Sequence, residues 1–233
     1  MKLLSRGARG FIEYIPGKYA WRAVHAEDYM VIHCLWVLGK GKGKGCGRFL
    51  LDQCKRDARK SKLNGVAMVT SRGNWLADER VFTNNGFEIV DEPPPSFKLA
   101  ALKFNKGSES PHFPKNLNRR FNKYGKGLTV LRTDQCPYLD QSVLELREIA
   151  NEKNLSFKEI ELTTARQVRA TAPSAFGVYN IVYNGKLLSY HPLDRKQMRK
   201  RLDEAGGPPR VEERGKGERI KGIGPLGKRA ASI

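Results

Sequence analysis

Long apolar runs are missing from this chain of 233 residues. The best run, residues 30–38, falls well short of the roughly 18 apolar residues that a membrane span needs, and it includes His33. The first six residues lack the apolar core of a secretory signal. These absences argue against a membrane protein and against a secreted one.

Cysteine is scarce as well, with four residues at positions 34, 46, 54 and 136. No two of them form a Cys-x-x-Cys pair, and their spacing fits neither a disulfide framework nor a zinc site. We therefore expect no metal centre and a reducing, cytoplasmic setting.

Acidic residues are few, because 24 Asp and Glu stand against 43 Lys and Arg, which gives a formal net charge of +19. Such a charge attracts nucleic acid and phosphorylated ligands. Base stacking favours aromatic residues interleaved with basic ones, and this pattern is clearest in the short run of residues 119–124. A basic nucleic-acid-associated protein is therefore an open alternative, although it is not the favoured one.

The spacing of apolar residues and turn residues predicts an α/β protein with two domains. Residues 1–104 form the first domain, and residues 105–127, rich in Pro, Lys, Asn and Gly, are expected to be an exposed linker. Residues 128–204 form the second domain. Residues 205–233 are expected to be a basic, disordered tail.

Within the first domain the pattern predicts strands at residues 10–15, 29–38, 66–70, 88–90 and 97–104, and helices at residues 48–62 and 78–85. The second domain has the predicted order βα, βα, ββα. Its strands are expected at residues 128–132, 157–162, 176–183 and 186–190, and its helices at residues 137–152, around residue 166 and at residues 194–204. Asn184 and Gly185 predict a tight hairpin turn between the last two strands.

A glycine-rich segment, residues 39–47, lies between a predicted strand and a predicted helix. Glycines let the backbone approach a ligand closely, and a helix N-terminus adds partial positive charge, so this order suits phosphate binding. The P-loop pattern fails because Arg48 follows Gly47, and a dinucleotide-binding loop would need an acidic residue where Thr70 and Ser71 stand. A flexible basic loop without a ligand is the alternative.

Residues 35–37, 42–47 and 50–51 together resemble the acetyl-CoA motif of GNAT acetyltransferases. In that motif Gln or Arg is followed, after two residues, by Gly-x-Gly or Gly-x-Ala. Lys42 stands at the Gln or Arg position and keeps the positive charge. Residues 81–87, which end in Gly-Phe, resemble the second motif of the family, so the resemblance covers roughly residues 8–104.

The resemblance implies a GNAT-type mixed sheet with flanking helices and transfer of an acetyl group from acetyl-CoA to the amine of a small molecule or protein. The strand around residues 35–37 is then expected to bulge and splay, so that its N–H groups hold the pantetheine arm and polarise the thioester. The side chain of Trp36 is expected in the core. The implied cofactor contacts are Leu35, Trp36, Val37, Lys42, Gly43, Lys44, Gly45, Cys46, Gly47, Arg48 and Asn74.

Two departures from the family pattern affect the expected chemistry. The usual acid of the family is a tyrosine, and Phe82, which cannot donate a proton, stands at its position. The strand, two helices and further strand that normally open the fold have no counterpart, which implies an N-terminally incomplete domain and makes CoA binding a safer expectation than turnover. His33 is the candidate base, with Glu13, Glu27 and Asp28 as alternatives that the sequence does not rank.

The second domain carries Cys136 followed by Pro137 and Tyr138, and residues 171–173 read Thr-Ala-Pro. This arrangement resembles a thioredoxin or glutaredoxin domain in which Leu139 replaces the second active-site cysteine. The resemblance implies a monothiol redox centre at Cys136, with a redox-inactive scaffold as the alternative. The pairing of the two domains resembles the YoaP-like group of acetyltransferases.

Three functions therefore stand side by side. The leading one is an acetyl-CoA-dependent N-acetyltransferase. A non-catalytic CoA-binding or monothiol redox module and a basic nucleic-acid-associated protein are the alternatives. Neither the acceptor nor the oligomeric state follows from these patterns.

Overall fold

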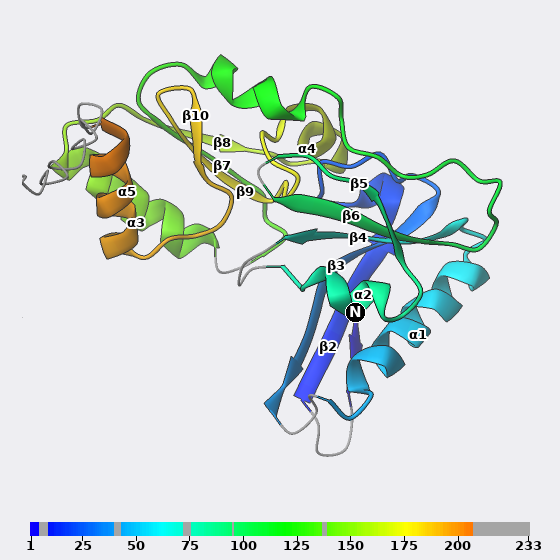
Figure 1. Cartoon of the computed structure of the whole chain (residues 1–233). Helices are drawn as coiled ribbons and strands as arrows, with labels where there is room; N and C mark the ends of the chain where they lie inside the picture. The colour runs from blue at the N-terminus through cyan, green and yellow to red at the C-terminus, as the bar shows by residue number, and fades with distance from the viewer. Residues whose placement is uncertain (5–8, 40–42, 72–75, 95, 137–138, 207–233) are drawn as a thin grey trace, which may run out of the picture.

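A computed structural model describes residues 1–4, 9–39, 43–71, 76–94, 96–136 and 139–206 (Figure 1). These residues form a six-stranded sheet in the order β1-β2-β3-β4-β6-β5 and a four-stranded sheet in the order β10-β9-β7-β8. We call residues 1–104 the first lobe and residues 128–206 the second lobe. The predicted α/β class is confirmed, since both sheets are flanked by helices (Figure 1).

The first sheet consists of β1 (Lys2–Leu3), β2 (Arg9–Pro16), β3 (Tyr29–Leu38), β4 (Gly65–Ser71), β5 (Glu88–Asp91) and β6 (Phe97–Lys103). Only β3 and β4 pair in parallel, and the other neighbours are antiparallel. A parallel pair needs a crossover connection, which α1 (Cys46–Lys60) provides. The short α2 (Glu79–Thr83) packs on β5 and β6.

Helix α1 lies on β2, β3 and β4 (Figure 1). Its apolar residues Leu50, Leu51, Cys54 and Ala58 are fully buried and recur at helical spacing, so one face of the helix closes the core. Burying one leucine side chain contributes about 1.5–3 kcal/mol. All seven residues of β4 are buried, which agrees with its position inside the sheet.

The second sheet consists of β7 (Leu128–Arg132), β8 (Phe157–Glu161), β9 (Tyr179–Tyr183) and β10 (Lys186–Ser189). Its helices are α3 (Leu139–Glu152), α4 (Ala165–Thr171) and α5 (Arg195–Gly206), and the predicted order βα, βα, ββα is confirmed. The backbone at Asn184 and Gly185 has φ of 49° and 71°, as the predicted hairpin turn requires. Helix α5 extends to Gly206, so the first two residues of the predicted tail are helical.

Residues 105–127 are not the exposed linker that their composition predicts. Phe113 and Leu117 are buried, and a 3₁₀ helix, η3 (Leu117–Tyr124), runs through the segment. Arg120 donates hydrogen bonds to the carbonyl oxygens of Arg169 (2.6 Å) and Ala172 (3.2 Å). The composition indicates turns, but it carries no signal for these long-range contacts.

The two lobes meet directly. The Tyr190 hydroxyl lies 3.1 Å from the Ser71 Oγ at the end of β4, and the Tyr190 ring packs edge-on against Phe97, with 4.6 Å between ring centroids. Arg169 of α4 donates to the Lys18 carbonyl oxygen (3.2 Å) in η1 (Gly17–Tyr19). Within the described ranges, none of the helices has the length and apolar character that crossing a membrane requires.

Candidate functional site

The parallel pairing of β3 and β4 ends before either strand ends. It runs from Tyr29 opposite Gly65 to Ile32 opposite Met68. β3 then continues to Leu38, and β4 continues to Ser71. The second half of β3 therefore separates from β4, and among the described residues it has one edge without a strand partner. This is the predicted splay.

The ladder between β2 and β3 shifts register at the same place. Glu13 pairs with Cys34 and Tyr14 pairs with Ile32, so His33 is an extra residue on β3. Such a β-bulge leaves one residue outside the regular pairing and bends the strand. The predicted bulge is thus present on this strand, at His33, and it interrupts the alternation of side chains beyond Ile32.

The glycine-rich segment brings two glycines with positive φ to the start of α1. Gly43 has φ of 74°, and Gly45, the N-cap residue, has φ of 75°. The first helical hydrogen bond runs from the Phe49 N–H to the Gly45 carbonyl oxygen (2.9 Å). The N–H groups of residues 46–48 precede that bond and so have no acceptor within the helix. They form a positive helix end that can bind an anion.

This loop is open. Apart from the adjoining backbone, a Cβ atom placed on Gly43, Gly45 or Gly47 would meet none of the described residues within 4 Å. Packing inside the protein therefore does not require glycine here, whereas the close approach of a ligand would. The predicted contacts Lys42 and Asn74 lie outside the described residues.

Among the predicted contacts on β3, Leu35 and Val37 are half-buried, and Trp36 is 45% exposed. The prediction that the Trp36 side chain lies in the core is wrong. The splay leaves this part of β3 with β2 as its strand neighbour, and Trp36 contacts Phe11 of β2 with ring centroids 6.0 Å apart. Lys44 and Arg48 are exposed, and Cys46 is half-buried.

His33 is buried, with both ring nitrogens engaged. Its Nε2 accepts a hydrogen bond from the Trp21 N–H (3.0 Å), and its Nδ1 lies 3.5 Å from Oε1 of Glu13. Burial lowers the pKa of His33, and the hydrogen bond with Glu13 opposes that shift. A neutral ring with its proton on Nδ1 satisfies both contacts. This geometry does not support the predicted role of His33 as a base, because no ring nitrogen is free to receive a proton.

Glu13 is the acidic candidate that lies beside the bulge. Its side chain is 35% exposed. The hydrogen bond with His33 is the main cause that lowers the pKa of Glu13, burial opposes it, and a hydrogen bond from Gln135 lowers it further. Glu27 instead forms an ion pair with Arg169 (3.3 Å), and both Glu27 and Asp28 precede the opposite end of β3. Position therefore ranks Glu13 first.

Arg22 joins the bulge to the second lobe. Its Nη2 donates to the His33 carbonyl oxygen (2.8 Å), and its Nη1 donates to the Phe176 carbonyl oxygen (3.0 Å). Burial lowers the pKa of Arg22 to about 10, so the guanidinium stays charged at neutral pH. Arg22 carries no sequence signal of its own, because one arginine in a short loop gives no pattern.

Cys136 lies at the same junction, after the end of β7, and it is half-buried. The neighbouring Gln135 donates from Nε2 to Oε1 of Glu13 (3.0 Å). Cys34 lies opposite Glu13 in the ladder. Burial is the main cause that raises the pKa of Cys34, the charge of Arg22 opposes this shift, and a thiolate at Cys136 adds to it. The predicted thiol of the second lobe thus belongs to the residue after Gln135, which contacts Glu13 beside the bulge.

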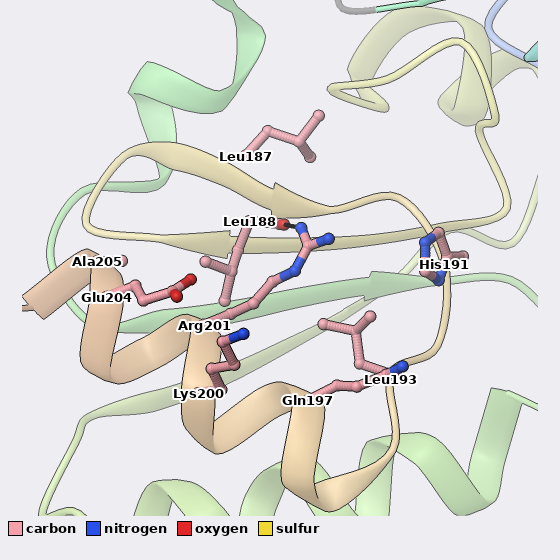
Figure 2. Close-up of a pocket in the computed structure, with 9 residues that line it drawn as sticks. All are labelled: Leu187, Leu188, His191, Leu193, Gln197, Lys200, Arg201, Glu204 and Ala205. Atoms are coloured by element: carbon pink, nitrogen blue, oxygen red, sulfur yellow. Dashed lines mark hydrogen bonds between the residues drawn. The ribbon is translucent and has the colours of Figure 1, made fainter. Parts of the chain in front are cut away.

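A separate pocket of about 660 Å³ lies between β10 and α5 (Figure 2). Leu188 and Leu193 give it apolar walls, and Lys200 and Arg201 add positive charge. Arg201 donates to the Leu188 carbonyl oxygen (2.7 Å), which fixes its guanidinium at the wall (Figure 2). In the part of the chain that the structure describes, no group of three or more His, Cys, Asp or Glu side chains is placed to bind a metal ion.

One curated relative is 30% identical to this chain over 202 residues, which are 86% of the chain and 80% of the relative. It is YoaP of Bacillus subtilis (strain 168), described as an uncharacterised N-acetyltransferase. No family model matches the chain.

Solved structures with some similarity include a GNAT family N-acetyltransferase, YhbS of Escherichia coli, in complex with CoA. It is 17% identical, with a TM-score of 0.32, and the match covers 47% of this chain and 62% of YhbS. Another is a proposed streptothricin acetyltransferase of Bacillus anthracis str. Ames in complex with acetyl coenzyme A. It is 22% identical with a TM-score of 0.34, over 41% of this chain and 56% of that one.

Proposed function

Because this chain belongs to the GNAT family of N-acetyltransferases, we propose that it transfers the acetyl group of acetyl-CoA to an amine at the splay of β3. The observation that carries the proposal is the end of the β3–β4 pairing at Ile32 and Met68, after which β3 continues to Leu38 and the glycine-rich loop follows. The β4-side edge of β3 and the start of α1 each offer backbone N–H groups to a ligand. A ligand with a phosphate end and an amide-containing arm matches these groups.

In this proposal the pyrophosphate of acetyl-CoA binds the N–H groups from Gly43 to Arg48. The positive φ of Gly45 and the absence of a Cβ at Gly47 support a close backbone approach. The pantetheine arm follows residues 35–37, which lie beyond the last residue of β3 that pairs with β4. Lys42 and Asn74 stay predicted contacts.

The thioester then lies near the bulge, beside Glu13. The amine nitrogen attacks the thioester carbonyl carbon, a C–N bond forms, the C–S bond breaks, and CoA leaves as a thiolate. Glu13, an ionised and partly exposed carboxylate, takes the proton that the amine loses. Backbone N–H groups on the free edge of β3 stabilise the oxyanion. Phe82 is fully buried and has no proton to give, so water protonates the thiolate.

We further propose that residues 128–204 form a thioredoxin-like domain, which follows a first domain of residues 1–104 along the chain. The sheet order β10-β9-β7-β8, with β7 parallel to β8 and antiparallel to β9, supports it. Cys136 follows β7 at the place where such a domain carries its thiol. A monothiol redox function at Cys136 is therefore the second candidate function.

Titration calorimetry with acetyl-CoA tests the cofactor, and thiol release in the presence of a panel of primary amines tests transfer. We expect binding of acetyl-CoA and amine-dependent release of CoA. Binding without release under any amine would favour the non-catalytic CoA-binding module. Absence of binding would leave the nucleic-acid and redox alternatives and would overturn the proposal.

A further inference from the structure

One hydrogen bond connects the second lobe to the carboxylate beside the bulge. Gln135 donates from Nε2 to Oε1 of Glu13 at 3.0 Å, across 122 positions of sequence. The same Oε1 lies 3.5 Å from Nδ1 of His33. Two donors thus converge on one oxygen of Glu13. Among the described residues, Oε2 has no hydrogen-bond donor, so it is the oxygen that can accept a proton.

Gln135 is itself held in place by its own lobe. Its N–H donates to Oγ1 of Thr133 (3.3 Å), and the Thr133 N–H donates to the Val178 carbonyl oxygen (3.0 Å). Thr133 is buried, with 1% of its surface exposed. The backbone that carries the Gln135 amide is therefore held in place by hydrogen bonds within the second lobe.

The lobes are also fixed to each other next to this contact. Arg22 bridges the carbonyl oxygens of His33 and Phe176, which belong to different lobes. Gly177 closes the same junction, since a Cβ there would lie 3.0 Å from the Arg22 Cα and from the Trp21 carbonyl oxygen. The relative position of Gln135 and Glu13 is thus set by buried, close contacts.

We propose that Gln135 is a positioning residue for acetyl transfer, through which the second lobe completes the active site by holding the Glu13 carboxylate with Oε2 free to receive the amine proton. This inference rests on the proposed function. It gives the second lobe a part in the chemistry of the first that does not depend on any redox reaction of Cys136.

The groups that face Glu13 come from three parts of the chain. His33 and Cys34 belong to β3, Arg22 follows η1, and Gln135 follows β7. The hydrogen bond from Gln135 lowers the pKa of Glu13, so its loss raises that pKa. Since Glu13 acts as a base, the acidic limb of the pH–rate profile must then move to higher pH.

The test compares Gln135→Ala with the parent chain, using acetyl-CoA and a panel of lysine, spermidine and a peptide with a free N-terminus. We expect kcat to fall about tenfold, as the loss of one hydrogen bond to a charged group predicts, with the KM for acetyl-CoA unchanged. Gln141→Ala is the matched control. Gln141 is exposed and donates to Glu145 (3.2 Å) within the second lobe, away from Glu13.

A double-mutant cycle separates positioning from general damage to the fold. If Gln135 acts through the carboxylate, Gln135→Ala causes no further loss in a Glu13→Gln background. A readout that needs no acceptor is the pKa of Glu13 measured by carbon-detected NMR. We expect it to rise in Gln135→Ala and to stay constant in Gln141→Ala.

The inference is overturned if Gln135→Ala matches the parent in kcat, in its pH profile and in the pKa of Glu13, or if its effect is unchanged by Glu13→Gln. A parent chain that transfers acetyl groups to amines would then still satisfy the proposed function. If the parent itself transfers no acetyl group to any amine of the panel, the proposed function fails, and the inference fails with it.

Discussion

Arg22 donates through Nη2 to the carbonyl oxygen of His33, the extra residue of the β-bulge, at 2.8 Å. A bulge takes one residue out of the regular ladder, and a buried carbonyl without a partner is costly. Arg22 satisfies this carbonyl and at the same time reaches Phe176 of the second lobe. The bend of β3 and the docking of the lobes therefore depend on the same side chain.

Replacing this arginine should destabilise the whole chain. Arg22→Met removes hydrogen bonds to the carbonyl oxygens of His33 and Phe176. The Phe176 oxygen keeps the hydrogen bond from the Val178 N–H (2.9 Å), whereas the His33 oxygen loses its arginine donor in a buried junction. At about 1–3 kcal/mol for one unsatisfied buried group, we expect the free energy of unfolding in urea to fall by about 1–3 kcal/mol.

Arg199→Met is the control for this change, since Arg199 pairs with Glu152 on the exposed surface. Exposed ion pairs contribute little to stability, so the control should unfold close to the parent. Equal unfolding free energies for Arg22→Met and Arg199→Met would contradict the assigned role of Arg22.

Acidification should weaken the fold through His33. Burial holds the pKa of His33 below 6.5, so the unfolded chain binds a proton that the folded chain does not. The stability is therefore highest above pH 6.5 and falls as the pH drops from 6.5 towards the folded pKa, by up to about 1.4 kcal/mol per pH unit for one such group.

Urea unfolding between pH 7.5 and pH 5 measures this slope. His33→Gln removes the titrating group and should reduce the slope. It should not abolish the slope, because burial also lowers the pKa of His25 and of His191. An unchanged slope in His33→Gln would show that the buried imidazole is not responsible.

The cysteines should differ in their reaction with iodoacetamide at neutral pH. Cys54 is fully buried in α1, and burial is the main cause that raises its pKa, so we expect it to react last. Cys136 and Cys46 are half-buried and should react earlier. Acetyl-CoA should protect Cys46, which lies in the first turn of α1. Peptide mass spectrometry after timed labelling follows each site, and a Cys54 that reacts as fast as Cys136 would argue against this order.

The sequence predicted those parts of the fold that depend on local signals. The apolar run of β3 and the hairpin turn at Asn184 and Gly185 are local, and the structure has both. The glycine-rich loop is local too, and its positive φ angles follow from the glycines. The family resemblance added the splay and the bulge, which composition and periodicity do not contain.

The contacts that build the site are not local, and sequence reasoning missed them. Arg22 lies 154 positions from Phe176, and Gln135 lies 122 positions from Glu13. Neither separation produces a periodic pattern in the sequence. Trp36 has the apolar character of a core residue, yet it is exposed because β3 leaves β4 before reaching it. The separation of two strands depends on tertiary contacts. The local sequence around an aromatic residue therefore does not show whether the strand is still paired there.

The central claim is that acetyl-CoA binds at the glycine-rich loop, and titration calorimetry of Gly45→Val tests it most directly. Valine strains the positive φ at this position and blocks the approach of the pyrophosphate. Gly125→Val is the matched control, because Gly125 also has positive φ (67°) and open space around it, but lies far along the chain from the loop. Circular dichroism checks that both variants are folded. We predict that Gly45→Val binds acetyl-CoA more than about tenfold more weakly than the parent, and that Gly125→Val binds it as well as the parent does. Parent-like affinity in Gly45→Val would contradict the account.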